Sequence, residues 1–272
     1  MPDPDSLPTR GAVTLHLGSI LSRTLSTWVR NLPSFTVLSA VVFLPLLVWA
    51  VRATSIDATE TALESYDRWA EYAAALLSSL LSSALIYGVL EQIRGRRAGL
   101  WTCLWTGLRR IAPVVAVTLT VGLYGLLVVM AVSLPLLALT ATTSSTVVAG
   151  GALLVEVLAL AAVMTTYYVS VPVMVIERPG VRESMLRSQA LTRGNRLRIL
   201  GIWLSWACAE VGATIVAQGA LPGTVRESRL LALGLTVVLF APLAAISSAL
   251  VYHDLRRGIE GATLEELTAV FD

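Results

Sequence analysis

The 272-residue chain contains no lysine, two cysteines and two histidines, and only 14% of its residues are charged. Without lysine there is no P-loop with its phosphate-binding lysine. The sequence also contains no HExxH motif, no paired-cysteine motif and no GxSxG turn. These absences argue against a metalloprotease, a P-loop ATPase and a common serine hydrolase, and the sequence predicts no metal ion or other cofactor. Cys103 and Cys208 are not expected to form a disulfide.

Charge is missing altogether from Ile111 to Val155, a run of 45 residues. A helix that crosses a bilayer needs about 20 mostly apolar residues. Similar windows recur along the chain, and the mean hydropathy is +0.75. The sequence therefore predicts an all-α, polytopic membrane protein with a bundle of six transmembrane helices. The expected spans are 34–52, 72–92, 112–139, 146–175, 199–220 and 230–252.

The six spans leave little of the chain for anything else. We predict a single integral membrane domain over 1–272, with a flexible tail at 1–10 and no removable signal peptide. There is no room for a soluble catalytic domain of about 100 residues.

Arginine placement predicts the orientation. Sixteen of the twenty arginines lie before the first span, between spans two and three, between spans four and five, or after span six. The 53–71 loop instead carries five acidic residues. Because arginine accumulates on the cytoplasmic side of membrane proteins, both termini are expected in the cytoplasm, at a bacterial inner membrane.

Amphipathic stretches precede the odd-numbered spans. Apolar residues recur at helical spacing within 11–30, 98–110 and 181–195, with arginines on other faces, and 263–271 has a similar pattern. Each is predicted to be a helix lying in the cytoplasmic interface. The ends of the even-numbered spans also resemble one another, which favours three repeats of a surface helix and a transmembrane hairpin. The alternative is that short cytoplasmic loops simply accumulate arginine and tryptophan.

Two carboxylates fall in the middle of predicted spans. Glu156 and Glu210 each lie about ten residues from a span end, or roughly 15 Å deep, and Tyr124 reaches a similar depth. One interpretation is a site for a proton, a cation or a cationic substrate. The other is a pair of neutral carboxyls that hydrogen-bond to neighbouring helices and fix their packing.

The arginines of the predicted cytoplasmic side could bind anionic lipid head groups. The candidates are Arg96, Arg97, Arg109, Arg110 and Arg182. The alternative is that they set topology and anchor the interface, and nucleic acid is not expected as a partner because these side chains lie against the membrane.

Two segments resemble a known family. The segment 177–195 reads ERPGVRESMLRSQALTRGN, with Pro172 shortly before it, and 252–267 reads YHDLRRGIEGATLEEL. Both resemble the membrane domain of bacterial glycerophosphoryl diester phosphodiesterases. The resemblance implies a polytopic membrane domain but no phosphodiesterase activity, because catalysis in that family belongs to a separate soluble barrel that this chain lacks.

Three functions stay open at this point. The first is a non-catalytic membrane protein that binds lipid or a partner protein, and the second is a small-solute or ion transporter that uses the midplane carboxylates. The third is an intramembrane enzyme acting on lipid, which would need His253, Asp254 and an arginine beside a lipid-sized groove. The sequence does not predict the oligomeric state.

Overall fold

The structure is a computed structural model that describes residues 15–54, 60–93, 99–142, 146–221 and 225–269. All regular secondary structure in these ranges is helical. The helices are α1 (Leu17–Arg30), α2 (Leu32–Thr54), α3 (Glu60–Ile93), α4 (Leu100–Arg109), α5 (Ile111–Thr142), α6 (Thr146–Thr166), α7 (Ser170–Ile176), α8 (Val181–Thr192), α9 (Arg196–Ala220) and α10 (Val225–Ala269).

Six segments are long and apolar enough to cross a membrane, so the predicted number of spans is confirmed. They lie at Leu32–Trp49, Tyr72–Ile93, Ile111–Ala138, Gly150–Ile176, Arg196–Ala220 and Gly234–Ile259. The protein therefore has the architecture of a multi-pass membrane protein.

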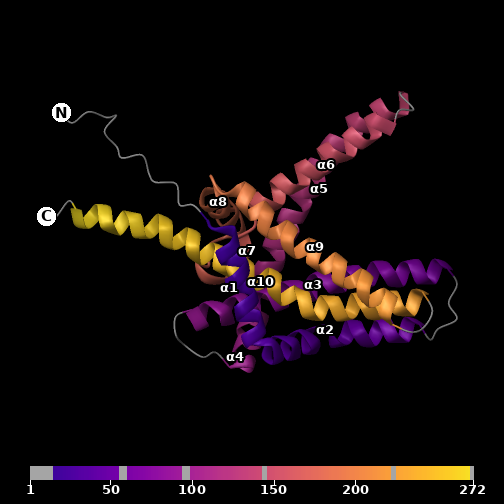
Figure 1. Cartoon of the computed structure of the whole chain (residues 1–272), viewed down its shortest axis with the longest axis horizontal. Coiled ribbons are helices and arrows are strands. Elements are labelled where there is room, and N and C mark those ends of the chain that lie inside the picture. The colour runs from indigo at the N-terminus through magenta and orange to yellow at the C-terminus, as the bar shows by residue number, and fades with distance from the viewer. Residues whose placement is uncertain (1–14, 55–59, 94–98, 143–145, 222–224, 270–272) are drawn as a thin grey trace.

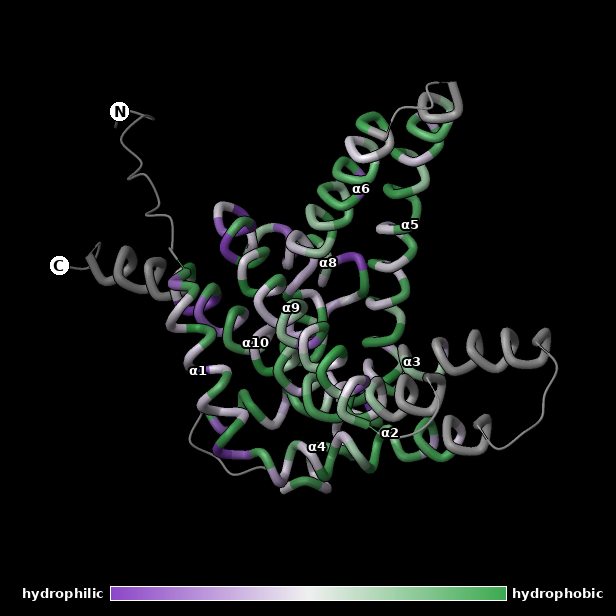
Figure 2. The backbone as a smooth tube through the Cα atoms, turned by 45° about the vertical axis from the view of Figure 1, so that its right-hand side comes forward, coloured by the Kyte–Doolittle hydropathy of each residue, from purple (hydrophilic) through white to green (hydrophobic). Residues whose placement is uncertain are grey.

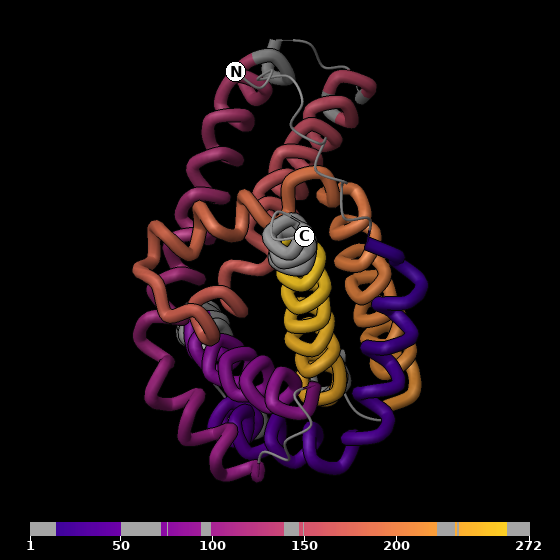
Figure 3. Tube along the Cα trace, turned by 90° about the vertical axis from the view of Figure 1, so that its left-hand side faces the viewer, coloured from indigo at the N-terminus to yellow at the C-terminus, as the bar shows by residue number. Residues whose placement is uncertain are grey.

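Helix α10 is the centre of the fold. Viewed along its axis it is surrounded by the other helices (Figure 3), and it packs on α1, α2, α3, α7, α8 and α9. Of its apolar window 61% is buried inside the protein, against 11% for the window in α9. Helix α10 thus meets mostly protein, whereas α9 leaves most of its surface for lipid.

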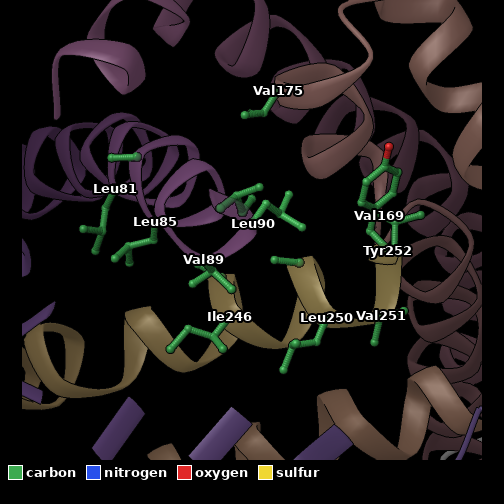
Figure 4. Packing of buried hydrophobic residues seen from close by; sticks show 14 of the residues in the cluster. Leu81, Leu85, Val89, Leu90, Val169, Val175, Ile246, Leu250, Val251 and Tyr252 are labelled. Carbon is green, nitrogen blue, oxygen red and sulfur yellow. The ribbon is translucent and has the colours of Figure 1, made fainter. Parts of the chain in front are cut away.

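The main core lies between α3 and α10. Leu81, Leu85 and Val89 of α3 lie close to Ile246 and Leu250 of α10 (Figure 4), and all five side chains are buried. Helix α2 packs on both α3 and α10. The α5–α6 hairpin instead diverges from the direction of α2, α3 and α10 (Figure 1). Large apolar side chains of that hairpin are exposed, as expected where the neighbour is lipid.

Polar segments gather at one end of the molecule. Figure 2 shows hydrophilic backbone along α1 and near α8, whereas α5 and α6 are mostly hydrophobic. The short helices α1, α4 and α8 each precede a hairpin of long helices. Their interfacial position and the threefold repeat stay predictions.

All four predicted surface helices differ from the structure in their bounds, and α4 differs least, with Leu100–Arg109 against 98–110. Helix α1 begins at Leu17 rather than at residue 11, and α8 ends at Thr192, before a turn into α9. The segment 263–271 does not start a helix of its own, because α10 continues to Ala269. The predicted tail at 1–10 lies outside the described residues.

The predicted fourth span is present at Gly150–Ile176, but it is not one continuous helix. Helix α6 ends at Thr166 and α7 begins at Ser170. Pro172 lies in the first turn of α7, where the missing proline N–H leaves no intrahelical bond unmade. The break frees the Thr166 carbonyl, which accepts hydrogen bonds from the hydroxyls of Ser188 (3.0 Å) and Thr192 (3.1 Å) on α8.

Pro242 interrupts the backbone hydrogen bonding of α10, and a side chain of α1 compensates for part of the loss. A proline inside a helix removes one backbone donor and disturbs the carbonyls of the preceding turn. The indole N–H of Trp28 on α1 donates to the Leu239 carbonyl at 3.1 Å. A side chain of a neighbouring helix therefore supplies a donor to this turn, as is found at prolines inside other membrane-spanning helices.

The hydroxyls of Ser188 and Thr192, which donate to the Thr166 carbonyl, allow a test of the helix break. Ser188→Ala or Thr192→Val alone leaves one donor on the carbonyl, so each should cost about 1 kcal/mol or less. The double variant leaves the carbonyl without a side-chain donor, and its loss should exceed the sum of the single losses by about 1 kcal/mol or more. The free energy of unfolding in detergent measures all three.

Ser26→Ala is the matched control, because its hydroxyl lies on the exposed face of α1 and bonds only the Arg23 carbonyl. Strictly additive losses in the double variant would contradict the role assigned to the pair.

Candidate functional site

A groove of about 520 Å³ lies between the short helices α1 and α4 and the long helices α2 and α3. We call it the α1–α4 groove. Its lining residues are Arg30, Asn31, Ser34, Phe35, Leu38, Ala84, Leu85, Gly88, Gln92, Gly99, Leu100 and Cys103.

The polarity of the groove changes along its depth. Arg30, Asn31 and Gln92 lie where α1 meets α2 and where α3 ends, at the polar end of the molecule. Leu38 and Leu85 lie seven to eight residues further along α2 and α3, which is about 10–12 Å deeper. Both side chains are buried, and so is that of Phe35. A polar entrance thus leads to an apolar floor.

A close helix contact holds one wall of the groove in place. Helix α4 approaches α3 at Gly107, where a Cβ would lie 2.9 Å from the Ala84 Cβ and 3.1 Å from the Ala84 nitrogen. The Ser83 hydroxyl donates to the Gly107 carbonyl at 3.3 Å. Small residues let helix backbones approach this closely, so Gly107 fixes the distance between the two helices.

The polar end combines one cation with side-chain amides. Asn31 Nδ2 donates to the Thr27 carbonyl at 2.8 Å and lies 3.4 Å from Gln92 Oε1, which links the α1–α2 corner to the end of α3. The exposed guanidinium of Arg30 has no hydrogen bond or ion pair with any residue that the structure describes. It is therefore available to a ligand.

The buried Cys103 supplies part of the groove wall. Burial raises the pKa of its thiol, and the nearby charge of Glu91 raises it further, while a backbone hydrogen bond acts in the opposite direction. Glu91 does not line the groove. Because a neutral thiol is a poor nucleophile and a poor metal ligand, Cys103 acts here as a small apolar side chain.

The predicted head-group arginines have different surroundings. Arg109 is exposed and its guanidinium lies 5.0 Å from the centre of the Trp105 ring. Arg110 donates to the Val175 carbonyl at 3.1 Å, near the end of α7. Burial, and next the charge of Arg178, lower the pKa of Arg110. Arg182 is exposed on α8.

Arg96 and Arg97 lie outside the described residues, in the connection from α3 to α4. Sequence reasoning missed Arg30, the arginine that lines the groove. Its position directly before the first predicted span was the available signal.

No hydrogen bond or ion pair between described residues joins the midplane candidates to one another. Glu156 is half-buried on α6, and Glu210 is exposed on α9. Tyr124 packs edge-on against Tyr167, with 5.6 Å between ring centres. The α1–α4 groove is not lined by either carboxylate. The contact that the structure gives Tyr124 is thus with an aromatic ring and not with a midplane carboxylate.

A polar network that the sequence did not predict joins α7, α8 and α10. Tyr252 donates to Glu177 Oε1 at 2.9 Å, and Arg187 forms an ion pair with the other oxygen of Glu177 at 3.3 Å. Arg256 donates to the Tyr252 hydroxyl at 3.1 Å. These residues lie in the segments 177–195 and 252–267, for which the sequence predicted a resemblance to the phosphodiesterase membrane domain. In this fold they fasten the α7–α8 corner to the central helix.

A second cluster joins α1 to α10. Arg23 forms an ion pair with Asp254 at 2.8 Å, and Asp254 also lies 3.3 Å from His253 Nδ1. This is the grouping of histidine, aspartate and arginine that the enzyme hypothesis required. None of the three lines the α1–α4 groove, however, so the hypothesis lacks its lipid-sized site there.

A second hollow, of about 650 Å³, lies at the α8–α9 corner. Its lining residues are Leu186, Gln189, Ala190, Arg193, Gly194 and Arg196. It has no apolar floor comparable to that of the α1–α4 groove, so we take the groove as the candidate site.

Comparison of the chain with protein-family models, with curated proteins and with solved structures finds no match in any of the three. The resemblance to the phosphodiesterase membrane domain therefore stays a prediction. The function proposed below therefore rests on the residues of the α1–α4 groove.

The close contact at Gly107 predicts that a larger residue there destabilises the packing of α4 on α3. In Gly107→Leu the new side chain clashes with Ala84, where the neighbouring atoms are backbone and Cβ and cannot move aside. Overpacking of this kind costs about 1–3 kcal/mol, and we expect a lower midpoint of thermal unfolding in detergent.

Gly122→Leu on α5 is the control, because a Cβ there meets no atom within 4 Å. Equal thermal midpoints for the two variants would show that α4 does not pack on α3 as described.

Proposed function

We propose that this protein is a non-catalytic, multi-pass protein of a bacterial inner membrane that binds a phospholipid in the α1–α4 groove, on the cytoplasmic side. The observation that carries the proposal is the order of the lining, with Arg30, Asn31 and Gln92 at one end and a buried apolar floor about 10 Å away. A phospholipid has the same order of chemistry, from a charged phosphate to acyl chains.

The size of the groove supports a head group and the first part of the chains. At about 520 Å³ it has the volume typical of a small-ligand site. The remaining length of the chains would stay in the bilayer beside α2 and α3. A lipid held in this way needs no deep cavity through the bundle.

The outer face of α4 supports a position in the membrane interface. Trp101 is 74% exposed, and Trp105 and Leu108 are also exposed, while Cys103 and Gly107 are buried against the protein. Tryptophan is enriched where the bilayer meets water. Arg109 beside Trp105 adds a cation at the same level. The groove would then open at the depth where lipid head groups lie.

The distribution of arginine supports the cytoplasmic side. Among the described residues, most arginines lie on α1, at the end of α4, around α8 and near the end of the last span at Arg256 and Arg257. A cytoplasmic leaflet rich in anionic lipid attracts such a surface, by about 1 kcal/mol for each arginine near it.

Filling the groove tests the proposal. Ser34→Trp places a large side chain between the α1–α2 corner and α3, and we expect the purified protein to retain fewer lipids in native mass spectrometry. The matched control is Val37→Trp, one turn further along α2 at a position that is 53% exposed and outside the groove. The same number of bound lipids in both variants would contradict the proposal.

The transport hypothesis makes a different prediction. If the groove is the functional site, the double variant Glu156→Gln, Glu210→Gln keeps its bound lipid, because neither residue lines the groove. Native mass spectrometry measures the lipid, and solute flux into proteoliposomes is measured on the same preparation. Flux that the double variant abolishes would favour transport through the midplane instead.

A further inference from the structure

We infer that the α1–α4 groove selects anionic phospholipids, because it binds the phosphodiester between the Arg30 guanidinium and the amino end of α4. The inference rests on the proposed function and adds the chemical class of the ligand. It is carried by the convergence of a free cation, two side-chain amides and a helix N-terminus on one cavity.

The groove carries a single positive charge among its described lining residues. Among the described lining residues, Arg30 is the only charged side chain. It closes the last turn of α1 and has no partner within the described protein. An arginine without a carboxylate partner keeps its five N–H donors for a ligand, and its planar fork suits phosphate oxygens.

The amino end of α4 also faces the groove. Gly99 and Leu100 line the groove, and Gly99 is the N-cap residue of α4. The first N–H groups of a helix have no partner inside it, and no side chain caps this end because the cap is glycine. A helix amino end with free N–H groups carries partial positive charge and binds phosphate.

The amides complete the polar end. Asn31 and Gln92 lie within 3.4 Å of each other at the corner where α1, α2 and α3 meet. Each carries an NH₂ group as well as an acceptor oxygen. The Asn31 NH₂ group already donates to the Thr27 carbonyl and to Gln92 Oε1, and this holds the Gln92 amide in place. The Gln92 NH₂ group is then the neutral donor beside the cation, while the apolar floor below holds the chains. A free phosphate ion would use only the upper part of this site.

The experiment compares lipid classes on the intact protein in nanodiscs that contain phosphatidylglycerol and phosphatidylcholine in equal amounts. Native mass spectrometry counts the lipids that stay bound. We expect the wild type to retain phosphatidylglycerol preferentially. Arg30→Gln should lower this preference about fivefold while the total amount of bound lipid remains.

A substitution at Gly99, the N-cap residue of α4, can weaken lipid selectivity while stabilising the helix. Gly99→Asp gives α4 a favourable N-cap and should not lower the thermal midpoint. Its carboxylate takes the place of the phosphate, so the preference for phosphatidylglycerol should fall. Gly99→Asn caps the same N–H groups but adds no negative charge, so the preference should fall less than in Gly99→Asp. The space exists, because the nearest atom to a Cβ there is Thr102 Oγ1 at 3.8 Å.

Three results would overturn the inference. The first is a wild type that retains both lipids equally, and the second is an unchanged preference in both Arg30→Gln and Gly99→Asp. The third is release of the bound lipid by inorganic phosphate, which would identify a free anion as the ligand. The first two leave the proposed lipid site intact, because that site fails only if Ser34→Trp and Val37→Trp bind equal amounts of lipid.

Discussion

The absence of water from the hydrocarbon core of a bilayer is the constraint on which this structure depends. Each backbone N–H and C=O there must find a partner within the protein, and the apolar windows meet the demand by forming long helices. Where a long helix is interrupted, side chains of other helices bond to the carbonyls at the interruption. Where α6 stops at Thr166, hydroxyls of α8 reach the carbonyl, and near Pro242 the Trp28 indole reaches another. The short helices α1 and α8 thus complete the backbone bonding of the long ones.

The same arrangement produces the groove. Helices α1 and α4 pack against the polar ends of the long helices, and α4 is held close to α3 because residue 107 has no side chain. The Asn31–Gln92 contact ties the α1–α2 corner to α3. A space remains between these contacts, polar at its entrance and apolar beneath. Its form therefore follows from how two short helices end a bundle, and its chemistry follows from the residues at those ends.

The long helices could be predicted from the sequence, because uncharged runs such as Ile111–Val155 have one stable form in lipid. The break at residues 167–169 could not, because Tyr167, Tyr168 and Val169 are apolar enough to continue a helix and the carbonyl is satisfied by α8. Most of the buried face of α8 was also missed, since Ser184, Ser188 and Thr192 are buried there beside the apolar Leu191. For the site, the predicted lipid arginines Arg109, Arg110 and Arg182 do not line the groove, and the position of Arg30 in it emerged only once the helices were placed.

The central claim is that six helices cross the membrane and leave the arginine-rich end, with its groove, in the cytoplasm. Labelling of single cysteines with a membrane-impermeant maleimide tests it most directly, in a background of Cys103→Ser and Cys208→Ser. Arg182→Cys should react only after the cells are permeabilised. Asp67→Cys should react in intact cells, although the predicted 53–71 loop is helical from Glu60 onward and Asp67 lies in the first part of α3. Labelling of Arg182→Cys in intact cells would contradict the orientation and the account of the groove that depends on it.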